Sequence, residues 1–580
     1  MAKVLKILGR IVGISFEWVL LVLILFAFAI RTSQFQTYLG SVATTYLSKE
    51  LKTELRIGKI DVVFFDKVYL KDVFVRDLHG DTLASLQQIM VRVKSLDFSG
   101  DYIHLSSVGL SQGRVGIERD TITGDYNYEF IADYFSGKKS NKPKSDPPKV
   151  TVDNIDIEWV TISYDDNRKG RNTYGMDYDH LRFNDVILHI EDLEEEKGII
   201  KFRLKDLQTQ EKSGFWLKKL FANAVIDPHK GVMLSNVEIN TSRSKLYASK
   251  LNMLMSTLKG FNDFEDSVSF DAVLDSSRVS LWDIAIFGPA LEGMNDVISL
   301  SGVVTRKVKD MQIKDLDLRF GSRSVIRGDY SLPDFRNLSA SSFNERIDYA
   351  LIDFSDVEQI NLPKRTGQTT LRFDGMVDRL EYVEIRNTSA RGSVNQFSLK
   401  SDKLQSVLGS VQVDNEMTFT KLKEGGYAFK RTMGEAYDVV VDSFNLAGFL
   451  DNPNFGNVAG KVYVSGVVGQ KDGIRLETLE GDVSKFHFND YSYSNIEVRN
   501  GSFIDHVLDA DLTVNDPNLQ LTFDGQIDVS KVQHFDFKVQ VEKANLGHLN
   551  FDKDPESSFT GNLDMDLTGK IGRASCRERV

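Results

Sequence analysis

The stretch "NLQLTFDGQIDVSKVQHFDFKVQV", residues 518–541, alternates apolar and polar side chains almost without a break. A period of two is typical of half-buried strands, because successive side chains of a strand point to opposite faces. Burying one large apolar side chain contributes roughly 1.5–3 kcal/mol, so we expect the apolar face of these two strands to be covered. Its apolar members are Leu519, Leu521, Phe523, Phe535, Phe537, Val539 and Val541.

A related pattern, two apolar residues at alternate positions followed by a glycine two residues later, recurs along the chain. Its irregular spacing predicts one strand-and-turn architecture extended along an axis, with bulges or bends at the glycines. The copies are Ile298, Leu300 and Gly302; Leu371, Phe373 and Gly375; Val462, Val464 and Gly466; Leu521, Phe523 and Gly525; and Met565, Leu567 and Gly569.

Helices are predicted to be minor elements. Apolar residues at helical spacing predict an amphipathic helix within residues 31–54, with its periodic part at 33–51. Its expected apolar side holds Phe35, Leu39, Val42, Tyr46, Leu47 and Leu51. Capping of the first strands is the preferred role, and a membrane-surface role is the alternative. Short helices are also expected after a turn in 120–135, at 214–222 and at 281–294.

The N-terminal segment predicts a membrane anchor. Basic residues within 1–10 precede an apolar stretch, residues 11–30, which at 1.5 Å per residue is long enough to cross about 30 Å of hydrocarbon. The basic side should stay cytoplasmic and place the bulk of the chain across the membrane. A cleaved signal peptide, with a small-residue site at 27–29, is the alternative.

Beyond the anchor, composition divides the chain further. Residues 55–135 are predicted to form an N-terminal β module, the Lys-, Ser- and Pro-rich residues 136–149 a linker, and residues 150–570 an elongated β region. The tail "IGRASCRERV", residues 571–580, resembles a translated sequencing adapter and is expected to be non-native, with the natural chain continuing past it. The lone cysteine, Cys576, lies in this tail.

Composition and motifs argue against several functions. A net charge of −12 over 580 residues does not suit nucleic-acid binding. The G-x-S-x-G match at 109–113 leads into another alternating stretch, whereas a nucleophile elbow needs a helix there. "DDNRKG" at 165–170 is read as a turn, because Met176 stands where a calcium loop requires Glu. The acidic run at 191–196 is read as a solvated turn. We therefore predict a protein that is not an enzyme, with no catalytic, cofactor-binding or metal-binding residues.

An ordered series of segments carries a family resemblance. It comprises residues 46–93, "EKSGFWLKKL" at 211–220, "NTSRSKL" at 240–246, "FNDYSYSNIEVRNGSF" at 488–503 and "DPNLQLTFDGQID" at 516–528. With the predicted anchor, these segments resemble the N-terminal region of the AsmA-like superfamily, specifically the TamB family of the translocation and assembly module.

The resemblance implies an inner-membrane-anchored, single-pass periplasmic protein with a mainly β fold. Its sheet would be rolled into an elongated, taco-like groove, apolar inside and polar outside, similar to the chorein-type bridge-like lipid-transfer proteins. Acyl chains of phospholipids would cover the apolar face during transport between inner and outer membranes. A C-terminal domain beyond this sequence would contact an outer-membrane BamA/TamA-like protein. No cofactor is implied.

Three alternatives stay open. The alternating residues could pack against a second sheet, as in a β-sandwich. The protein could instead aid insertion of outer-membrane proteins through exposed strand edges, and a secreted hydrolase or adhesin would need a site that the motif search does not find. In the groove interpretation, the expected lining residues are Ile298, Leu300, Leu371, Phe373, Val462, Val464, Leu519, Leu521, Phe523, Phe535, Phe537 and Val539.

Overall fold

The computed structural model describes residues 32–63, 66–96, 102–135, 149–331, 341–373, 379–423, 425–432, 437–470, 473–528 and 533–569. The predicted segments 1–10, 11–30 and 571–580, and all of the predicted linker except its last residue, therefore lie outside the described residues. Within the described ranges, no helix combines the length and the apolar character that a membrane span requires.

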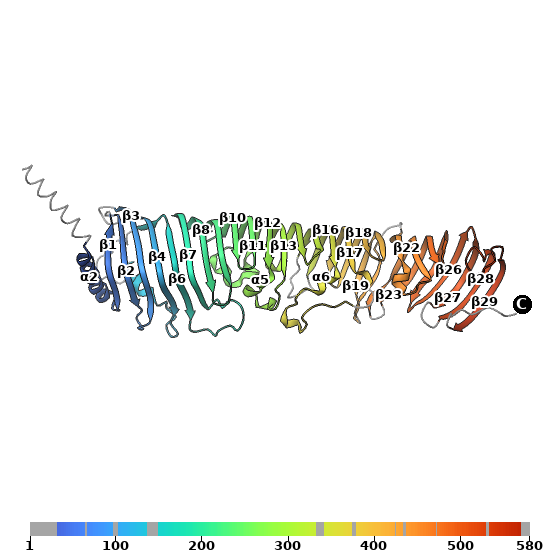
Figure 1. The fold of residues 1–580 in the computed structure, drawn as a ribbon, viewed down its shortest axis with the longest axis horizontal. Helices are drawn as coiled ribbons and strands as arrows, with labels where there is room; N and C mark the ends of the chain where they lie inside the picture. Colours follow the sequence, from blue (N-terminus) through green and yellow to red (C-terminus); the bar gives the residue numbers. More distant parts are fainter. Residues whose placement is uncertain are drawn as a thin grey trace, which may run out of the picture. The chain divides into compact units, whose positions relative to one another are not determined.

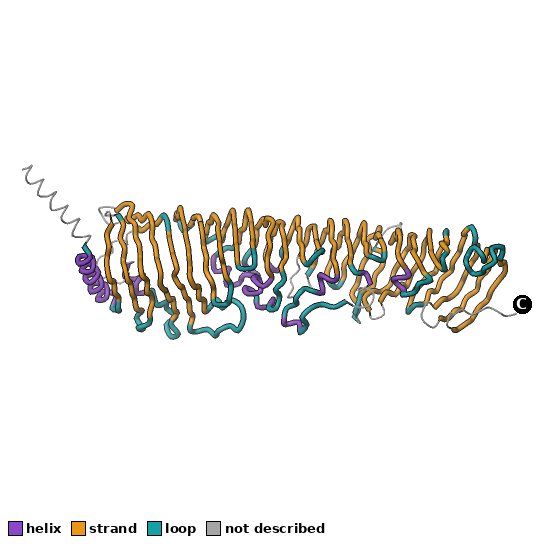
Figure 2. Tube along the Cα trace, viewed as in Figure 1, coloured by secondary structure: helices purple, strands orange, loops and turns teal. Residues whose placement is uncertain are grey.

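The fold is mainly β with a few short helices, as predicted. The chain forms two compact units. Unit 1 holds Met1–Asp263, Asp271–Asp296 and Pro363–Gly367, and unit 2 holds Phe264–Phe270, Val297–Leu362 and Gln368–Val580. Figure 2 shows how far the strands outnumber the helices.

In unit 1, neighbouring strands from β1 to β11 pair antiparallel, except that β4 pairs in parallel with β5 and β6. Figure 1 shows these strands side by side in chain order. The elements are α2 (Ser33–Leu51), β1 (Leu55–Val63), β2 (Lys67–Arg76), β3 (Thr82–Leu96), β4 (Tyr102–Arg119), α3 (Glu129–Phe135), β5 (Lys149–Val152), β6 (Ile155–Asp166), β7 (His180–Glu196), β8 (Ile199–Glu211), β9 (Trp216–Asp227), β10 (Gly231–Thr241), β11 (Lys245–Leu254), η1 (Leu258–Asp263), β12 (Ser269–Ser280, mostly in this unit), α5 (Leu281–Phe287), η2 (Pro289–Leu291) and η4 (Lys364–Thr366).

In unit 2, hydrogen-bonded antiparallel pairs connect β13 to β29 in one sheet. The elements are α4 (Phe264–Ser267), β13 (Val297–Lys307), η3 (Val308–Asp310), β14 (Gln312–Phe320), β15 (Ser324–Ser331), β16 (Ser342–Asp353), α6 (Phe354–Glu358), β17 (Tyr382–Ser393), β18 (Gln396–Ser406), β19 (Gly409–Lys421), β20 (Tyr427–Arg431), β21 (Val439–Asn445), α8 (Leu446–Leu450), β22 (Phe455–Gln470), β23 (Gly473–Phe488), β24 (Tyr491–Tyr493), β25 (Ile496–Ile504), β26 (Val507–Asp516), β27 (Leu519–Asp528), β28 (Gln533–Asn545) and β29 (Ser558–Gly569).

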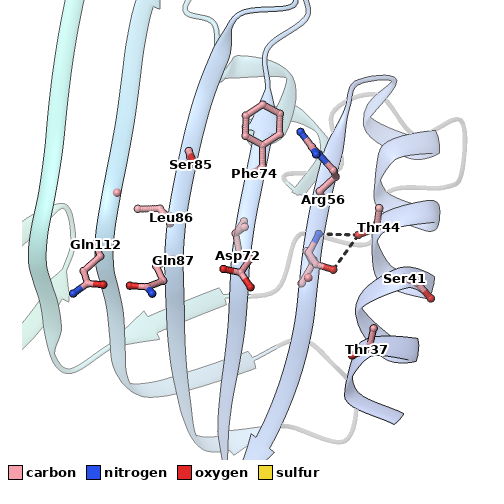
Figure 3. Close-up of a pocket in the computed structure, with 14 residues that line it drawn as sticks. Thr37, Ser41, Thr44, Arg56, Asp72, Phe74, Ser85, Leu86, Gln87 and Gln112 are labelled. Carbon is pink, nitrogen blue, oxygen red and sulfur yellow. Dashed lines mark hydrogen bonds between the residues drawn. The ribbon is translucent and has the colours of Figure 1, made fainter. Parts of the chain in front are cut away.

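Helix α2 covers the outer edge of strand β1, where it replaces the missing neighbour strand. The Thr44 hydroxyl accepts from the backbone N–H of Ile57 at 2.8 Å, and the Ser48 hydroxyl accepts from the Leu55 N–H at 3.1 Å and donates to its carbonyl at 2.8 Å. Figure 3 shows the helix beside the strand with the Thr44 contacts. Unpaired strand edges favour association with other chains, and here the Thr44 and Ser48 hydroxyl groups bind the edge backbone groups of Ile57 and Leu55.

The predicted helix at 33–51 is confirmed, but its predicted apolar side is wrong at two positions. Val42 and Tyr46 are 47% and 59% exposed. The side that meets β1 is built from small and polar residues, because the edge of a strand offers polar backbone groups. Gly40 is required there, since a Cβ would lie 2.8 Å from the Ile57 carbonyl oxygen.

The other helix predictions have mixed outcomes. The short helices expected within 120–135 and 281–294 are confirmed as α3 and α5. The helix predicted at 214–222 is wrong, because that segment enters strand β9. Its apolar residues satisfy helical spacing, yet pairing with β8 and β10 determines the conformation.

Two predictions outside helices also need correction. The acidic run at 191–196 is not a turn but the end of strand β7, where Glu194 pairs with Lys201 and the opposite charges favour pairing. Residues 371–373 lie in no strand. Phe373 instead packs against Phe354 of α6, with ring centroids 5.0 Å apart and ring planes tilted by 59°, and donates its N–H to Glu358 at 2.9 Å.

Candidate functional site

The sheet of unit 2 carries a continuous line of apolar residues, one from each strand except β20 and β24, each paired directly with the next. Paired residues of neighbouring strands point to the same face, so the line marks a single face. We call it the apolar row. Its members are Leu300, Leu318, Ile326, Ala350, Ile385, Leu404, Val411, Val441, Gly460, Val483, Ile496, Val514, Leu521, Val541 and Gly561.

Most side chains of the apolar row remain partly accessible. From Leu300 to Val483, Ala350 is the buried member with a side chain, and the other side chains are half-buried. Toward the C-terminal strands the row becomes buried, at Ile496, Val514 and Val541. Elements of the described chain therefore leave much of this face incompletely covered.

A parallel line on the same face, the mixed row, contains one polar pair. Thr388 and Ser401 are 2% and 0% exposed, and their hydroxyl groups hydrogen-bond each other at 2.6 Å. Since each hydroxyl has a partner, this pair interrupts the apolar surface without an unsatisfied polar group. The row runs through Leu316, Gly328, Ile347, Thr388, Ser401, Val413, Val439, Val462, Gly481, Val498, Leu512, Phe523, Val539 and Leu563.

A third line, the aromatic row, follows the same face closer to one end of the strands. The ring centroids of Phe397 and Phe419 lie 5.0 Å apart, and those of Phe419 and Phe429 lie 5.9 Å apart. The row consists of Phe343, Gly392, Phe397, Phe419, Phe429, Gly466, Leu476, Phe503, Leu508, Ile527 and Phe535.

The opposite face of the same strands is polar. Charged side chains there form ion pairs such as Arg327 with Asp317, whose atoms lie 3.0 Å apart. The paired residues on this face include Asp317, Arg327, Tyr349, Arg386 and Lys403, and further along Lys461, Asp482, Glu497, Thr513, Thr522, Gln540 and Asn562. The sheet of unit 2 is therefore two-sided, apolar on one face and polar on the other.

Unit 1 has apolar rows of the same kind. One row runs through Val62, Val68, Val91, Val108, Ile155, Ile190, Leu204 and Ala222. Another runs through Ile60, Leu70, Ile89, Leu110, Ile157, Leu188 and Leu207. Most of these side chains are half-buried.

Ten of the twelve predicted lining residues lie in strands of unit 2. Leu300 and Leu521 belong to the apolar row, and the mixed and aromatic rows contain Val462, Phe523, Val539 and Phe535. Ile298, Val464, Leu519 and Phe537 share these faces, at alternate positions of β13, β22, β27 and β28. Leu371 and Phe373, in contrast, lie in no strand. Alternation in the sequence located the face, but the pairing that joins strands into rows becomes visible only in the structure.

Part of the face at β25–β28 is already covered. Phe523 is 8% exposed and belongs to a buried cluster that includes Leu549 from the turn after β28. Phe523 also packs on Phe537 at a ring separation of 5.1 Å. This stretch of the face is therefore covered by neighbouring side chains and by a turn of the same unit.

Other candidate sites offer less chemistry. Ser111 of the G-x-S-x-G match lies inside β4, paired with Gln88 and Glu158, so no helix follows it. A hollow of about 730 Å³ beside α2, on the first strands, has mostly polar side chains around it (Figure 3). Another, of about 420 Å³, is acidic, and burial, followed by the charge of Asp81, raises the pKa of Glu118 there. Among the described residues, no three His, Cys, Asp or Glu side chains group as a metal site would require.

Comparison of the chain with family models, with curated proteins and with solved structures finds no match. The functional assignment therefore depends on the geometry of the two faces.

Proposed function

We propose that this protein shields the acyl chains of phospholipids on the apolar faces of its sheets and so carries lipid between the inner and outer membranes. The observation that carries the proposal is the apolar row of unit 2, which continues from strand to strand without a charged member. In this proposal each sheet curves into a groove, with residues 11–30 anchoring the chain in the inner membrane and the strands in the periplasm.

Energetics support a ligand with long apolar chains. Complete burial of one aliphatic side chain contributes roughly 1.5–3 kcal/mol, so covering a half-buried one contributes about 1 kcal/mol. Summed along a row, this gain favours an extended apolar ligand over a compact one. Transport itself needs no catalytic group, because an acyl chain exchanges one apolar contact for an equivalent one on the next strand.

The assembly alternative needs a different surface. Strand addition uses unpaired backbone groups at a sheet edge, whereas the rows lie on a face. At the β1 edge, moreover, α2 already occupies the backbone groups of Leu55 and Ile57. The face is therefore the feature to test first.

The test compares adjacent residues of one strand. A photo-crosslinking amino acid is placed at Val411, in the apolar row, and separately at Gln412, which points to the opposite face of β19. After irradiation in cells, phospholipid adducts are sought by mass spectrometry. Adducts at Val411 but not at Gln412 are expected. Equal labelling at both positions, or labelling at neither, contradicts the proposal, and crosslinks to outer-membrane proteins would favour the assembly role.

A further inference from the structure

The apolar face of unit 2 contains a carboxylate in an unusual place. Alternate positions of β16 put Phe343, Glu345 and Ile347 on one face; Phe343 belongs to the aromatic row and Ile347 to the mixed row. Across the sheet Glu345 pairs with Ala390, which pairs in turn with Leu399. The Glu345 carboxylate therefore lies between the aromatic row and the mixed row.

Glu345 is held in position by Ser331 at the end of β15. The Ser331 hydroxyl donates to one carboxylate oxygen at 2.9 Å, and the Ser331 N–H donates to the other at 3.0 Å. Burial raises the pKa of Glu345, and these hydrogen bonds oppose the rise. Among the described residues, no hydrogen bond or ion pair joins Glu345 to a cationic side chain, so the site holds an oriented carboxylate whose partner is Ser331.

Tyr330, adjacent to Ser331 in the chain, supplies a second polar group on the same face. It pairs with Ile313 and lies two residues from Gly328 of the mixed row. Its hydroxyl is buried, and among the described residues it has no hydrogen-bond partner. Buried polar atoms are nearly always satisfied, so this hydroxyl is a donor that a ligand oxygen could satisfy. Burial raises the pKa of Tyr330, and the charge of Glu345 adds to the rise.

Aromatic rings complete the surroundings of the carboxylate. Phe343 is two residues from Glu345 on the same strand face, about 7 Å along the strand, and its ring lies 6.1 Å from that of Phe397. Aromatic faces attract ammonium groups, and a carboxylate attracts them more strongly when both are partly removed from water.

We propose that Glu345 and Tyr330 form a headgroup site that selects phospholipids with a primary ammonium, the phosphoethanolamine class, over anionic ones. The ammonium group binds the Glu345 carboxylate beside Phe343, and a phosphate oxygen accepts a hydrogen bond from the Tyr330 hydroxyl. The inference rests on the proposed function, because the acyl chains of the same lipid would lie along the neighbouring apolar and mixed rows.

The experiment incubates the purified full chain with vesicles of equal parts phosphatidylethanolamine and phosphatidylglycerol. The protein is recovered, and both bound lipids are quantified by mass spectrometry. The variants are Glu345→Gln, which keeps an acceptor for Ser331, and Tyr330→Phe, which removes the unpartnered hydroxyl. Glu384→Gln is the matched control on the opposite face of the adjacent strand β17, where Glu384 pairs with Arg386. Thermal unfolding is recorded for every variant.

The wild type and Glu384→Gln are expected to enrich phosphatidylethanolamine, and Glu345→Gln and Tyr330→Phe to reduce that enrichment roughly three- to tenfold while binding similar total lipid. Unchanged selectivity in Glu345→Gln, with normal total binding, overturns the headgroup site and leaves the proposed function standing. Failure of the wild type to bind either lipid overturns both. If Glu345→Gln unfolds, Tyr330→Phe decides the question, since removal of an unsatisfied hydroxyl does not lower stability.

Discussion

At the residue scale, buried carboxylates of the short helices hold turns in place through hydrogen bonds. Asp356 of α6, 2% exposed, accepts hydrogen bonds from the backbone N–H groups of Ser322, Arg323 and Ser324, between 2.7 and 2.9 Å. Gly321 at φ +60° makes room, because a Cβ there would lie 2.2 Å from the Asp356 carboxyl carbon. The β14–β15 turn thus depends on one charged side chain.

The pH dependence of the free energy of unfolding, compared between the wild type and an Asp356 variant, tests this dependence. Burial raises the pKa of Asp356, but the hydrogen bonds outweigh burial and hold the pKa well below its usual range. A depressed pKa contributes stability that is present above the unfolded value, about 3.9, and is lost as pH falls through the folded value. We expect Asp356→Asn to lower the free energy of unfolding by about 2–3 kcal/mol at pH 7, measured by urea denaturation.

The size of this loss should shrink as the pH is lowered below 4, because the unfolded wild-type chain then takes up a proton at Asp356 that the folded chain takes up only at lower pH. Asp348→Asn is the matched control on β16, where the Asp348 side chain is 56% exposed. A loss of the same size at every pH, or an equal loss in the control, contradicts the role assigned to Asp356.

At the element scale, α5 repeats the arrangement of α6. Asp283 of α5 accepts hydrogen bonds from Thr241, at 2.6 Å, and from Ser244, in the turn between β10 and β11. In both cases a helix directly follows a strand, β12 or β16. Its aspartate binds the hairpin turn between the two strands that precede that strand. The sequence places "SRS" in both turns, but which helix reaches which turn follows from strand order.

Helix α2 is the element whose loss should change association. Substitution Gly40→Val puts side-chain atoms against the β1 backbone, where even a Cβ lies too close. We expect the helix to detach, the free energy of unfolding to fall by about 1–3 kcal/mol, and concentration-dependent oligomers to appear through the freed β1 edge. Light scattering measures the oligomers. Thr45→Ala, on the exposed side of α2, should stay like the wild type, and a monomeric Gly40→Val of normal stability would contradict the capping role.

At the scale of the whole molecule, alternation made the β class and many strands predictable, because a period of two needs only local residues. Register was not predictable, since residues such as Leu300 and Leu318 become row neighbours only after pairing. The sequence did not identify Glu345 as a site residue, for a related reason. Its alternation with Phe343 and Ile347 is visible in the sequence, but the hydrogen bonds from Ser331 and the face it shares with Tyr330 come from β15.

Under the proposed function, the extent of the apolar row determines how many lipids one chain can hold. With about 4.8 Å between strands, the half-buried part of the row, from Leu300 of β13 to Val483 of β23, extends about 43 Å along the sheet, while one leaflet of a bilayer is about 15 Å thick. We expect native mass spectrometry to show several phospholipids on one chain, at more than one occupancy. A single saturating lipid would contradict a continuous path and indicate one discrete pocket.

The capped edge at β1 also bears on how such a chain can change over evolutionary time. With that end closed by α2, insertion of a hairpin elsewhere adds two strands and about 10 Å of sheet without creating a new free edge at β1. Each inserted hairpin that keeps the alternation also continues the apolar rows. The length of the sheet is therefore a trait that gene duplication can adjust in small steps, while the helix that terminates it stays the same.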